Sequence, residues 1–295
     1  MKLAVALTIA GSDSGGGAGI QADLKTFAAL GVHGTSAITA VTAQNTMGVS
    51  DYVELPLDII RAQIDDVVGD LAPAAAKTGM LASPEIIAVV AAAIEDHGIA
   101  SLVVDPVMVA KGGAKLLHDD AVEALRTRLI PLAALITPNL PEAEVLLGRP
   151  IGSRDERERA ARDLVGLGCQ GAVVKGGHAG EDADDVVCDG DAVRWLPGSR
   201  IETGNTHGSG CTFSAAVTAC LARGSRMQDA LLEAKLFVTG AIQHSLEIGS
   251  GHGPVNPMWQ LNMTLPREVV GVPSGAGGGG LAARTPKADA QGTSR

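Results

Sequence analysis

Short apolar runs alternate with helical patterns of hydrophobic residues through most of the chain. The apolar runs predict β-strands at residues 3–10, 36–41, 75–78, 102–105, 134–137 and 172–175. The helical patterns predict helices at residues 19–30, 57–68, 84–97, 120–129, 141–147, 154–167, 210–222 and 227–246. Alternating strands and helices form a mostly parallel sheet covered on both faces. We therefore expect an α/β fold whose ligands gather at the carboxyl ends of the strands.

Two further strands, at residues 185–188 and 192–196, flank the sequence Asp189-Gly190-Asp191. This spacing predicts a β-hairpin. The alternating pattern continues to about residue 266, so we expect a single domain at residues 1–266. Residues 267–295 are rich in Gly, Ala, Ser and Pro and have no hydrophobic periodicity. That composition predicts a disordered tail without a function of its own.

Composition narrows the classes of partner. The 295-residue chain has a formal net charge of -10 and only 2% aromatic residues. These values argue against nucleic acid, which selects basic patches and stacking platforms. The apolar N-terminal run lacks a convincing cleavage site, and no apolar stretch reaches transmembrane length. The four cysteines form no CxxC pair, so the sequence suggests neither a zinc site nor a redox pair. We expect a cytoplasmic protein that acts on small molecules, with no membrane partner.

The segment TGNTHGSGCT, residues 203–212, is a glycine-rich turn that runs directly into an apolar helix. The first turn of a helix has N–H groups without internal partners, and glycines let a phosphate approach them. Gly208, Ser209, Gly210 and Cys211 would form such an anion hole, and a helix N-terminus would favour a Cys211 thiolate. By itself the pattern fits equally well a glycine-rich loop that merely starts a helix.

A second glycine-rich loop, residues 11–19, follows the first strand and contains the G-x-G-x-x-A spacing of dinucleotide-binding folds. The acidic residue that such folds require after the second strand is missing, because Gln44 and Asn45 stand there. The chain also lacks a G-x-x-x-x-G-K-[ST] sequence. The sequence therefore favours neither an NAD site nor a P-loop.

Polar residues follow several predicted strands. Gln44 offers donors and an acceptor that suit one edge of an aminopyrimidine, although a loop amide that caps backbone has the same pattern. Asp105 and Glu142 are candidate Mg²⁺ ligands, and Lys175 is a candidate phosphate ligand. Taken alone, the segments of Asp105 and Glu142 fit ordinary turns better than a metal site, and a solvated role fits Lys175 equally well. His207 reads as a loop hydrogen-bonder.

Five motifs together resemble those of the hydroxymethylpyrimidine/phosphomethylpyrimidine kinases. In order they are GSDSGGGAGIQADLKTF (11–27), ITAVTAQNT (38–46), VDPVM (104–108), PNLPE (138–142) and NTHGSGCT (205–212). The resemblance runs from about residue 3 to about residue 262. Ser209 replaces a commoner threonine, and the chain departs from the family pattern after Gly-His-Gly-Pro at residues 251–254.

The resemblance implies a ribokinase-like three-layer α/β/α sandwich. It also implies ATP-dependent phosphorylation of 4-amino-5-hydroxymethyl-2-methylpyrimidine to its monophosphate and then its pyrophosphate, in thiamine biosynthesis, by a homodimer that uses Mg²⁺. Related sugar kinases place an aspartate where Cys211 stands. The alternatives are a pyridoxal or pyridoxine kinase and a catalytically silent nucleotide-sensing protein on the same fold.

Carried over position by position, the resemblance gives each motif a role. Gln44, Gly11, Asp23, Met80 and Val107 would bind the pyrimidine. Lys175, Asn139 and Glu142 would bind ATP, and Asp105 and Glu142 would bind the metal. Gly208, Ser209, Gly210 and Cys211 would form the anion hole, with Cys211 nearest the acceptor hydroxyl.

Overall fold

The computed structural model describes residues 3–109, 113–118, 120–177, 183–190 and 192–264 of the chain, and the side chains only as far as residue 261 within the last range. One sheet runs through this described part and contains nine strands. They are β1 (Val5–Asp13), β2 (His33–Asn45), β3 (Gly48–Glu54), β4 (Ala75–Thr78), β5 (Leu102–Val104), β6 (Leu135–Ile136), β7 (Gly171–Val174), β8 (Asp185–Asp189) and β9 (Ala192–Leu196).

The strand order is β3-β2-β1-β4-β5-β6-β7-β8-β9. The central strands from β2 to β7 pair in parallel. The two ends of the sheet are antiparallel, through β3 at one edge and through β8 and β9 at the other. The predicted hairpin is therefore confirmed, with Asp189 paired to Ala192. One of its two loop residues, Asp191, lies outside the described residues.

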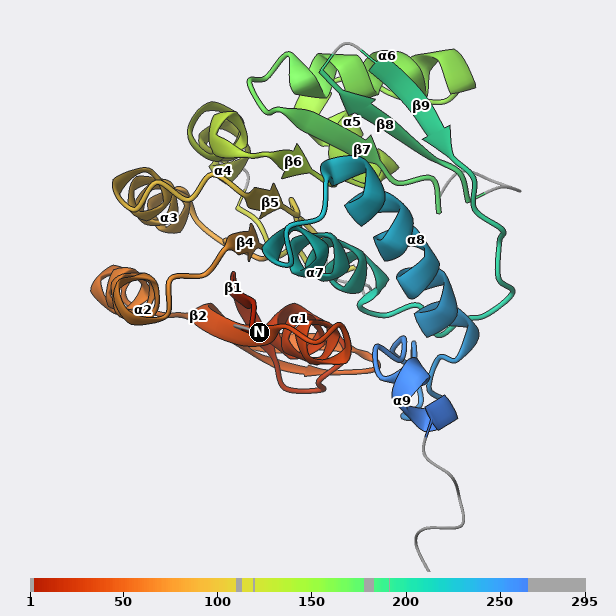
Figure 1. Ribbon diagram of the computed structural model, residues 1–295, viewed down its shortest axis with the longest axis horizontal. Helices are drawn as coiled ribbons and strands as arrows, with labels where there is room; N and C mark the ends of the chain where they lie inside the picture. Colours follow the sequence, from red (N-terminus) through yellow and green to blue (C-terminus); the bar gives the residue numbers. More distant parts are fainter. Residues whose placement is uncertain (1–2, 110–112, 119, 178–182, 191, 265–295) are drawn as a thin grey trace, which may run out of the picture.

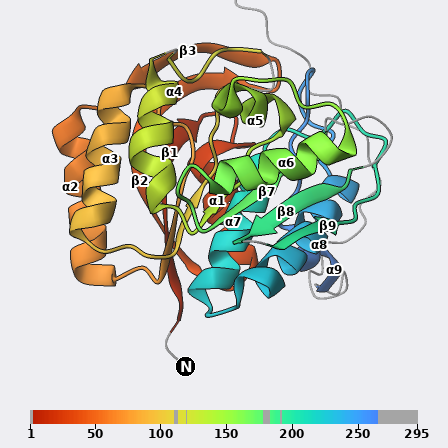
Figure 2. The same cartoon turned by 90° about the horizontal axis from the view of Figure 1, so that it is seen from above.

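Helices cover both faces of the sheet, which confirms the predicted three-layer sandwich (Figures 1 and 2). One layer contains α1 (Gly19–Ala29), α7 (Ser209–Ala222) and α8 (Met227–Gln243), which pack on one another. The other contains α2 (Leu57–Leu71), α3 (Pro84–Asp96), α4 (Ala121–Ala124), α5 (Leu140–Leu147) and α6 (Arg154–Val165). No helix among the described residues is long and apolar enough to span a membrane.

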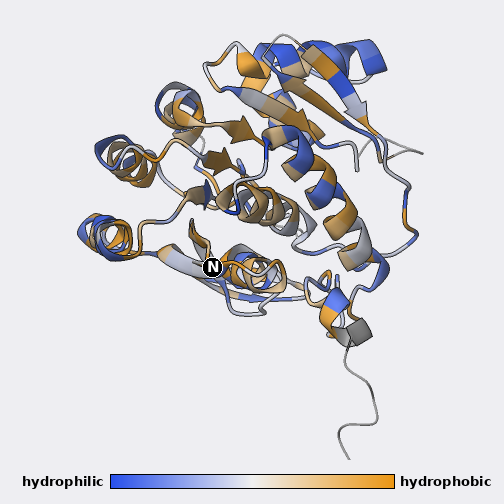
Figure 3. Cartoon of the chain, in the orientation of Figure 1, coloured by the Kyte–Doolittle hydropathy of each residue, from blue (hydrophilic) through white to orange (hydrophobic). Residues whose placement is uncertain are grey.

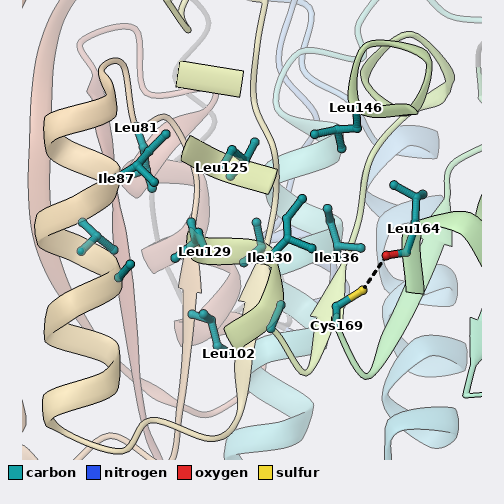
Figure 4. Close-up of a cluster of buried hydrophobic side chains, with 14 of the residues drawn as sticks. Leu81, Ile87, Leu102, Leu125, Leu129, Ile130, Ile136, Leu146, Leu164 and Cys169 are labelled. Atoms are coloured by element: carbon teal, nitrogen blue, oxygen red, sulfur yellow. Dashed lines mark hydrogen bonds between the residues drawn. The ribbon is translucent and has the colours of Figure 1, made fainter. Parts of the chain in front are cut away.

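The central strands and α7 are hydrophobic, whereas the outer helices expose polar faces (Figure 3). The largest core cluster joins the sheet to the layer that contains α2 to α6 (Figure 4). Ile87, Leu129 and Ile136 are fully buried there. A Cys169 thiol donates to the Leu164 carbonyl at 3.3 Å in the same cluster. Helix α7 is apolar on nearly every side because it lies between the sheet, α1 and α8.

The sequence pattern missed two elements and misjudged a third. Strand β3 is a half-exposed edge strand, so it has no apolar run to reveal it. Helix α9 (Trp259–Thr264) has only six residues, too short for a helical period to show. The helix predicted at 120–129 is α4 followed by a π-helical turn (Leu125–Leu129) and a 3-10 turn that contains Pro131. The predicted tail, residues 267–295, lies outside the described residues.

Candidate active site

A cleft of about 970 Å³ opens at the carboxyl ends of the parallel strands. Its position follows from the fold, because strands that leave the sheet in one direction bring their following loops together. Every residue predicted for the site lines this cleft except Asp23. The lining residues among them are Gly11, Gln44, Met80, Val107, Asp105, Asn139, Glu142, Lys175, Gly208, Ser209, Gly210 and Cys211.

The N-terminus of α7 points into the cleft. Gly208 caps this helix with a φ of 79°, in the left-handed region, and a Cβ there would lie 1.8 Å from the Gly17 carbonyl oxygen. Only glycine therefore lets the first loop pack against the turn. The N–H groups of Gly210 and Cys211 have no partner within the helix, and the helix dipole adds positive potential at that point. Such a helix N-terminus is suited to binding an anion.

Cys211 lines the cleft in the first turn of this helix. Burial raises the pKa of the thiol to about 12, although the Lys77 ammonium acts in the opposite direction. Asp23 and Asp105 raise it further. The prediction of a depressed thiol pKa was therefore wrong for the free protein, because desolvation outweighs the helix dipole. Cys211 is a neutral thiol near pH 7.

Asp105 and Lys175 form an ion pair on the side of the cleft below the anion hole. Lys175 Nζ lies 3.2 Å from Asp105 Oδ1, and Ser214 of α7 donates to Asp105 Oδ2 at 3.0 Å. Burial acts to raise the pKa of Asp105, but Lys175 and Lys77 hold it below its ordinary value. A Cβ on Gly210 would lie 3.2 Å from Lys175 Nζ. The lysine is thus adjacent to the helix N-terminus, where it adds positive charge.

Glu142 and Asn139 form a capping box at the start of α5. The Asn139 side chain accepts from the Glu142 N–H at 2.9 Å, and Glu142 Oε2 accepts from the Asn139 N–H at 2.8 Å. Both residues line the cleft, so the pair that starts the helix also shapes the site. Burial raises the pKa of Glu142 to about 7, although Lys175 lowers it.

The donor set here fits a hard divalent cation. Asp105 and Glu142 supply carboxylate oxygens, the ligand type that Mg²⁺ prefers. A nearby cation would also offset the desolvation that raises the pKa of Glu142. Within the described residues, no group of three or more His, Cys, Asp or Glu side chains could hold a metal by itself. A bound Mg²⁺ would therefore share its ligands with phosphates and water.

Asp23 lies behind the cleft wall and is fully buried. It accepts from Lys77 Nζ at 2.8 and 2.9 Å and from the Thr8 hydroxyl at 2.7 Å. Lys77 is also fully buried, and desolvation acts to lower its pKa, but Asp23, Cys211 and Asp105 together raise the pKa above its ordinary value. Lys77, and not Asp23, is the member of the pair that lines the cleft.

The opposite wall of the cleft is apolar and lies beside Gln44. Met80 and Leu116 belong to one small buried cluster, and Val107 packs against it. The strand register shifts twice next to this wall, between Ala10 and Ser12 of β1 and beside Gln44 of β2. Such irregularities redirect side chains at the ends of strands. Gln44 stays in β2, paired with Val49 of β3, and lines the cleft.

Several cleft residues escaped the sequence reasoning. The Lys77 side chain was hidden in a four-residue strand, and its signal was a lysine in an otherwise apolar run. Asp13 binds His207, which the sequence suggested only as a loop hydrogen-bonder. Lys235 of α8 donates to Asp185 Oδ2 at 2.7 Å near the other end of the cleft. No local pattern marks these partners, because each pair joins segments far apart in the chain.

Known proteins resemble this chain in both sequence and fold. A Bacillus subtilis hydroxymethylpyrimidine/phosphomethylpyrimidine kinase is 52% identical over 87% of this chain and 95% of its own length. A Geobacter sulfurreducens thiamine biosynthesis bifunctional protein is 49% identical over 85% of this chain and 51% of its own length. The structure of an ADP complex of Bacillus subtilis pyridoxal kinase has a TM-score of 0.83, with 41% identity over 88% of this chain and 99% of its own.

An anion hole beside a lysine and two carboxylates suits phosphoryl transfer to a small molecule. Together with this sheet, it defines the class of ribokinase-like small-molecule kinases. The chain belongs to the phosphomethylpyrimidine kinase family, whose family model matches residues 13–256.

Proposed function

We propose that this protein phosphorylates 4-amino-5-hydroxymethyl-2-methylpyrimidine to its monophosphate and then to its pyrophosphate, using ATP, in thiamine biosynthesis. One observation carries the proposal: the N-terminus of α7, Gln44 and the Lys175–Asp105 pair all line the same cleft. The names of the relatives support the substrate and the pathway. The ADP complex of the related pyridoxal kinase supports the nucleotide.

The pyrimidine would lie against the apolar wall. Met80 and Val107 would contact the ring, Gly11 would leave room for it, and Gln44 would pair with its edge. Asp23 would act indirectly, by holding Lys77 in place. The site would thus offer one hydrogen-bonding side chain on an apolar surface, the usual composition of a small-molecule pocket.

The nucleotide would lie on the other side of the anion hole. Lys175 would neutralise its phosphates, and Asn139 would line its path. Asp105 and Glu142 would hold Mg²⁺, which supplies charge neutralisation at the transferred phosphoryl group. The backbone N–H groups of residues 208–211 would stabilise the charge that develops on that group in the transition state.

The test is ATP turnover with a panel of hydroxymethyl heterocycles, with products identified by ³¹P NMR. We expect the aminopyrimidine alcohol to yield first the monophosphate and then the pyrophosphate. Phosphorylation of other alcohols, with neither pyrimidine accepted, would overturn the proposal. Gln44→Ala should raise KM for the aminopyrimidine with less effect on KM for ATP, since the ring edge loses its partner. An equal loss for both substrates would instead indicate damage to the fold.

Pyridoxal is the second candidate substrate, because the structural relative described above is a pyridoxal kinase. The same panel decides between them through the ratio of kcat/KM values. We also retain the expectations of a cytoplasmic homodimer, and analytical ultracentrifugation tests the oligomeric state.

A further inference from the structure

The imidazole of His207 lies between a carboxylate and the carboxamide of Gln44. Its Nε2 is 3.1 Å from Asp13 Oδ2 and 3.3 Å from the amide nitrogen position of Gln44. His207 and Asp13 are almost completely buried, at 7% and 3% exposure, and all three residues line the cleft. His207 also immediately precedes the anion-hole residue Gly208.

Asp13 is an ionised acceptor. Burial acts to raise its pKa, but the His207 hydrogen bond and the N–H groups of Ala18 and Gly15 bring that pKa below its ordinary value. Its Oδ2 already accepts from the Gly17 and Ala18 N–H groups at 2.9 and 2.8 Å. A carboxylate only accepts, so the His207 nitrogen that faces it carries a proton.

That proton determines which end of the Gln44 amide faces His207. An amide NH₂ group opposite the Nε2–H would place two donors in contact, whereas the amide oxygen would share this hydrogen. Amide nitrogen and oxygen are assigned by their hydrogen bonds. The oxygen of Gln44 therefore faces His207, and the NH₂ group faces the other way.

Thr42 completes the assignment from the opposite side. Its hydroxyl donates to the Ser12 carbonyl at 2.9 Å, so toward the Gln44 amide atom at 3.1 Å it offers a lone pair. That lone pair accepts an N–H from the amide. The Gln44 backbone is itself held, because Ser14 Oγ accepts from its N–H at 2.8 Å and donates to its carbonyl at 2.7 Å.

We propose that His207 and Thr42 are positioning residues that lock the Gln44 carboxamide in one orientation and so determine which ring edge the cleft accepts. His207 uses one lone pair of the amide oxygen and Thr42 uses one N–H. The remaining lone pair and N–H of the Gln44 amide form one edge. On the substrate, the lone pair accepts from the amino group and the N–H donates to the adjacent ring nitrogen. This inference rests on the proposed function, in which Gln44 reads the pyrimidine.

A matched pair of substrates tests the orientation. The 4-amino substrate presents a donor beside an acceptor, whereas the 5-hydroxymethyl-2-methyl-4-oxo-3H-pyrimidine presents an acceptor beside a donor. A locked amide pairs with only one of them. We expect the wild-type kcat/KM for the amine to exceed that for the oxo compound by roughly 10³-fold or more, since both polar contacts are mispaired in the latter.

His207→Phe removes the proton donor but keeps a flat ring, and Thr42→Val removes the acceptor with little change of shape. In each variant the amide is free to rotate, so the amine-to-oxo ratio should fall at least tenfold. KM for the amine should rise several-fold, with kcat and KM for ATP little changed. His252→Phe is the control, because His252 is exposed, hydrogen-bonds the Gly204 carbonyl and is not among the described residues that line the cleft, so the ratio should stay intact. Equal losses on both pyrimidines in both variants would overturn the proposal.

A second measurement separates this inference from the function. In the ligand-free wild-type protein with ¹⁵N-labelled histidine, NMR should show a proton on His207 Nε2, and Asp13→Asn should perturb that signal. A proton on Nδ1 alone would overturn the orientation argument whatever the enzyme phosphorylates. Conversely, an Nε2 proton with no turnover of either pyrimidine would contradict the proposed function only.

Discussion

At the scale of single residues, burial decides the charge of two groups in the cleft. Cys211 and Glu142 both have raised pKa values, of about 12 and about 7. In each case the nearest lysine lowers the pKa by less than desolvation raises it. The thiol is therefore protonated at neutral pH, and the carboxyl is divided between its two forms.

Cys211→Ala should slow the two phosphorylations by the same factor, roughly tenfold or less. A thiol with a pKa of about 12 has almost no thiolate at pH 7, so it is a poor general base for the alcohol. The monophosphate is already mostly ionised and needs no base. Single-turnover rates from the alcohol and from the monophosphate provide the measurement. A much larger loss for the alcohol would show that bound substrates lower the thiol pKa and make Cys211 a base.

Glu142→Gln should remove a pH dependence of stability. Between pH 4.5 and about 7 the folded state keeps a proton on Glu142 that the unfolded state has lost, so the wild type loses stability as pH rises across this range. The total loss is about 3 kcal/mol. With nucleotide and divalent cations removed, the Tm of the variant relative to wild type should therefore rise from pH 5 to pH 8.

Glu156→Gln serves as the control for this prediction. Glu156 occupies the same capping-box position in α6, but it is only partly buried and backbone N–H groups lower its pKa. It is ionised in both the folded and unfolded states above pH 5, so its variant should show a constant Tm difference between pH 5 and pH 8. A constant difference for Glu142→Gln as well would contradict the raised pKa.

At the scale of elements, two helices begin with a capping box, but only one of the two boxes lines the cleft. Asn139 and Glu142 form the capping box of α5, and Ser153 and Glu156 form that of α6. The α5 cap lines the cleft, whereas the α6 cap, with Ser153 exposed and Glu156 half-buried, does not. The pair therefore separates the contribution of a cap to stability from its contribution to the site.

Asn139→Ala and Ser153→Ala should each cost about 1 kcal/mol of stability, the usual loss for an N-cap side chain. Only Asn139→Ala should also weaken ATP binding, because it loosens the first turn of α5, which positions the proposed nucleotide residue Glu142. Urea denaturation and isothermal titration with a non-hydrolysable ATP analogue provide the two measurements. Equal ATP affinity in both variants would show that the α5 cap has no part in the site.

At the scale of the whole molecule, the folded body extends as far as α9. The indole of Trp259 stacks on His244 with ring centroids 5.3 Å apart, and a Cβ on Gly240 would lie 2.4 Å from the indole. Glycine in α8 thus lets the last helix close on the body.

Truncation after Pro266 should leave Tm and turnover unchanged, because residues 267–295 have too little apolar content to join a core. Truncation after Asn256 removes Trp259 and should lower Tm by several degrees. Differential scanning fluorimetry and steady-state turnover of both truncated proteins test this. A drop in either quantity after the shorter deletion would show that the tail contacts the body or the cleft.

The sequence by itself determined the central architecture. Each parallel strand was an apolar run and each major helix a periodic pattern, so burial on both faces was visible locally. Edge strand β3 and the short α9 were not predicted, since a half-exposed strand and a single helical turn give weak periodicity. The motifs also determined the family, because five of them in the right order are far more specific than any one.

Only the tertiary structure decided which polar side chains face one another. Asp13 and His207 are 194 residues apart, and Asp23 and Lys77 are 54 apart, so no local pattern links them. The protonation of Cys211 likewise depends on how completely the fold removes water from the thiol. The sequence supplied the helix N-terminus that would favour a thiolate, but desolvation is a property of the packed molecule, and here it is the larger effect.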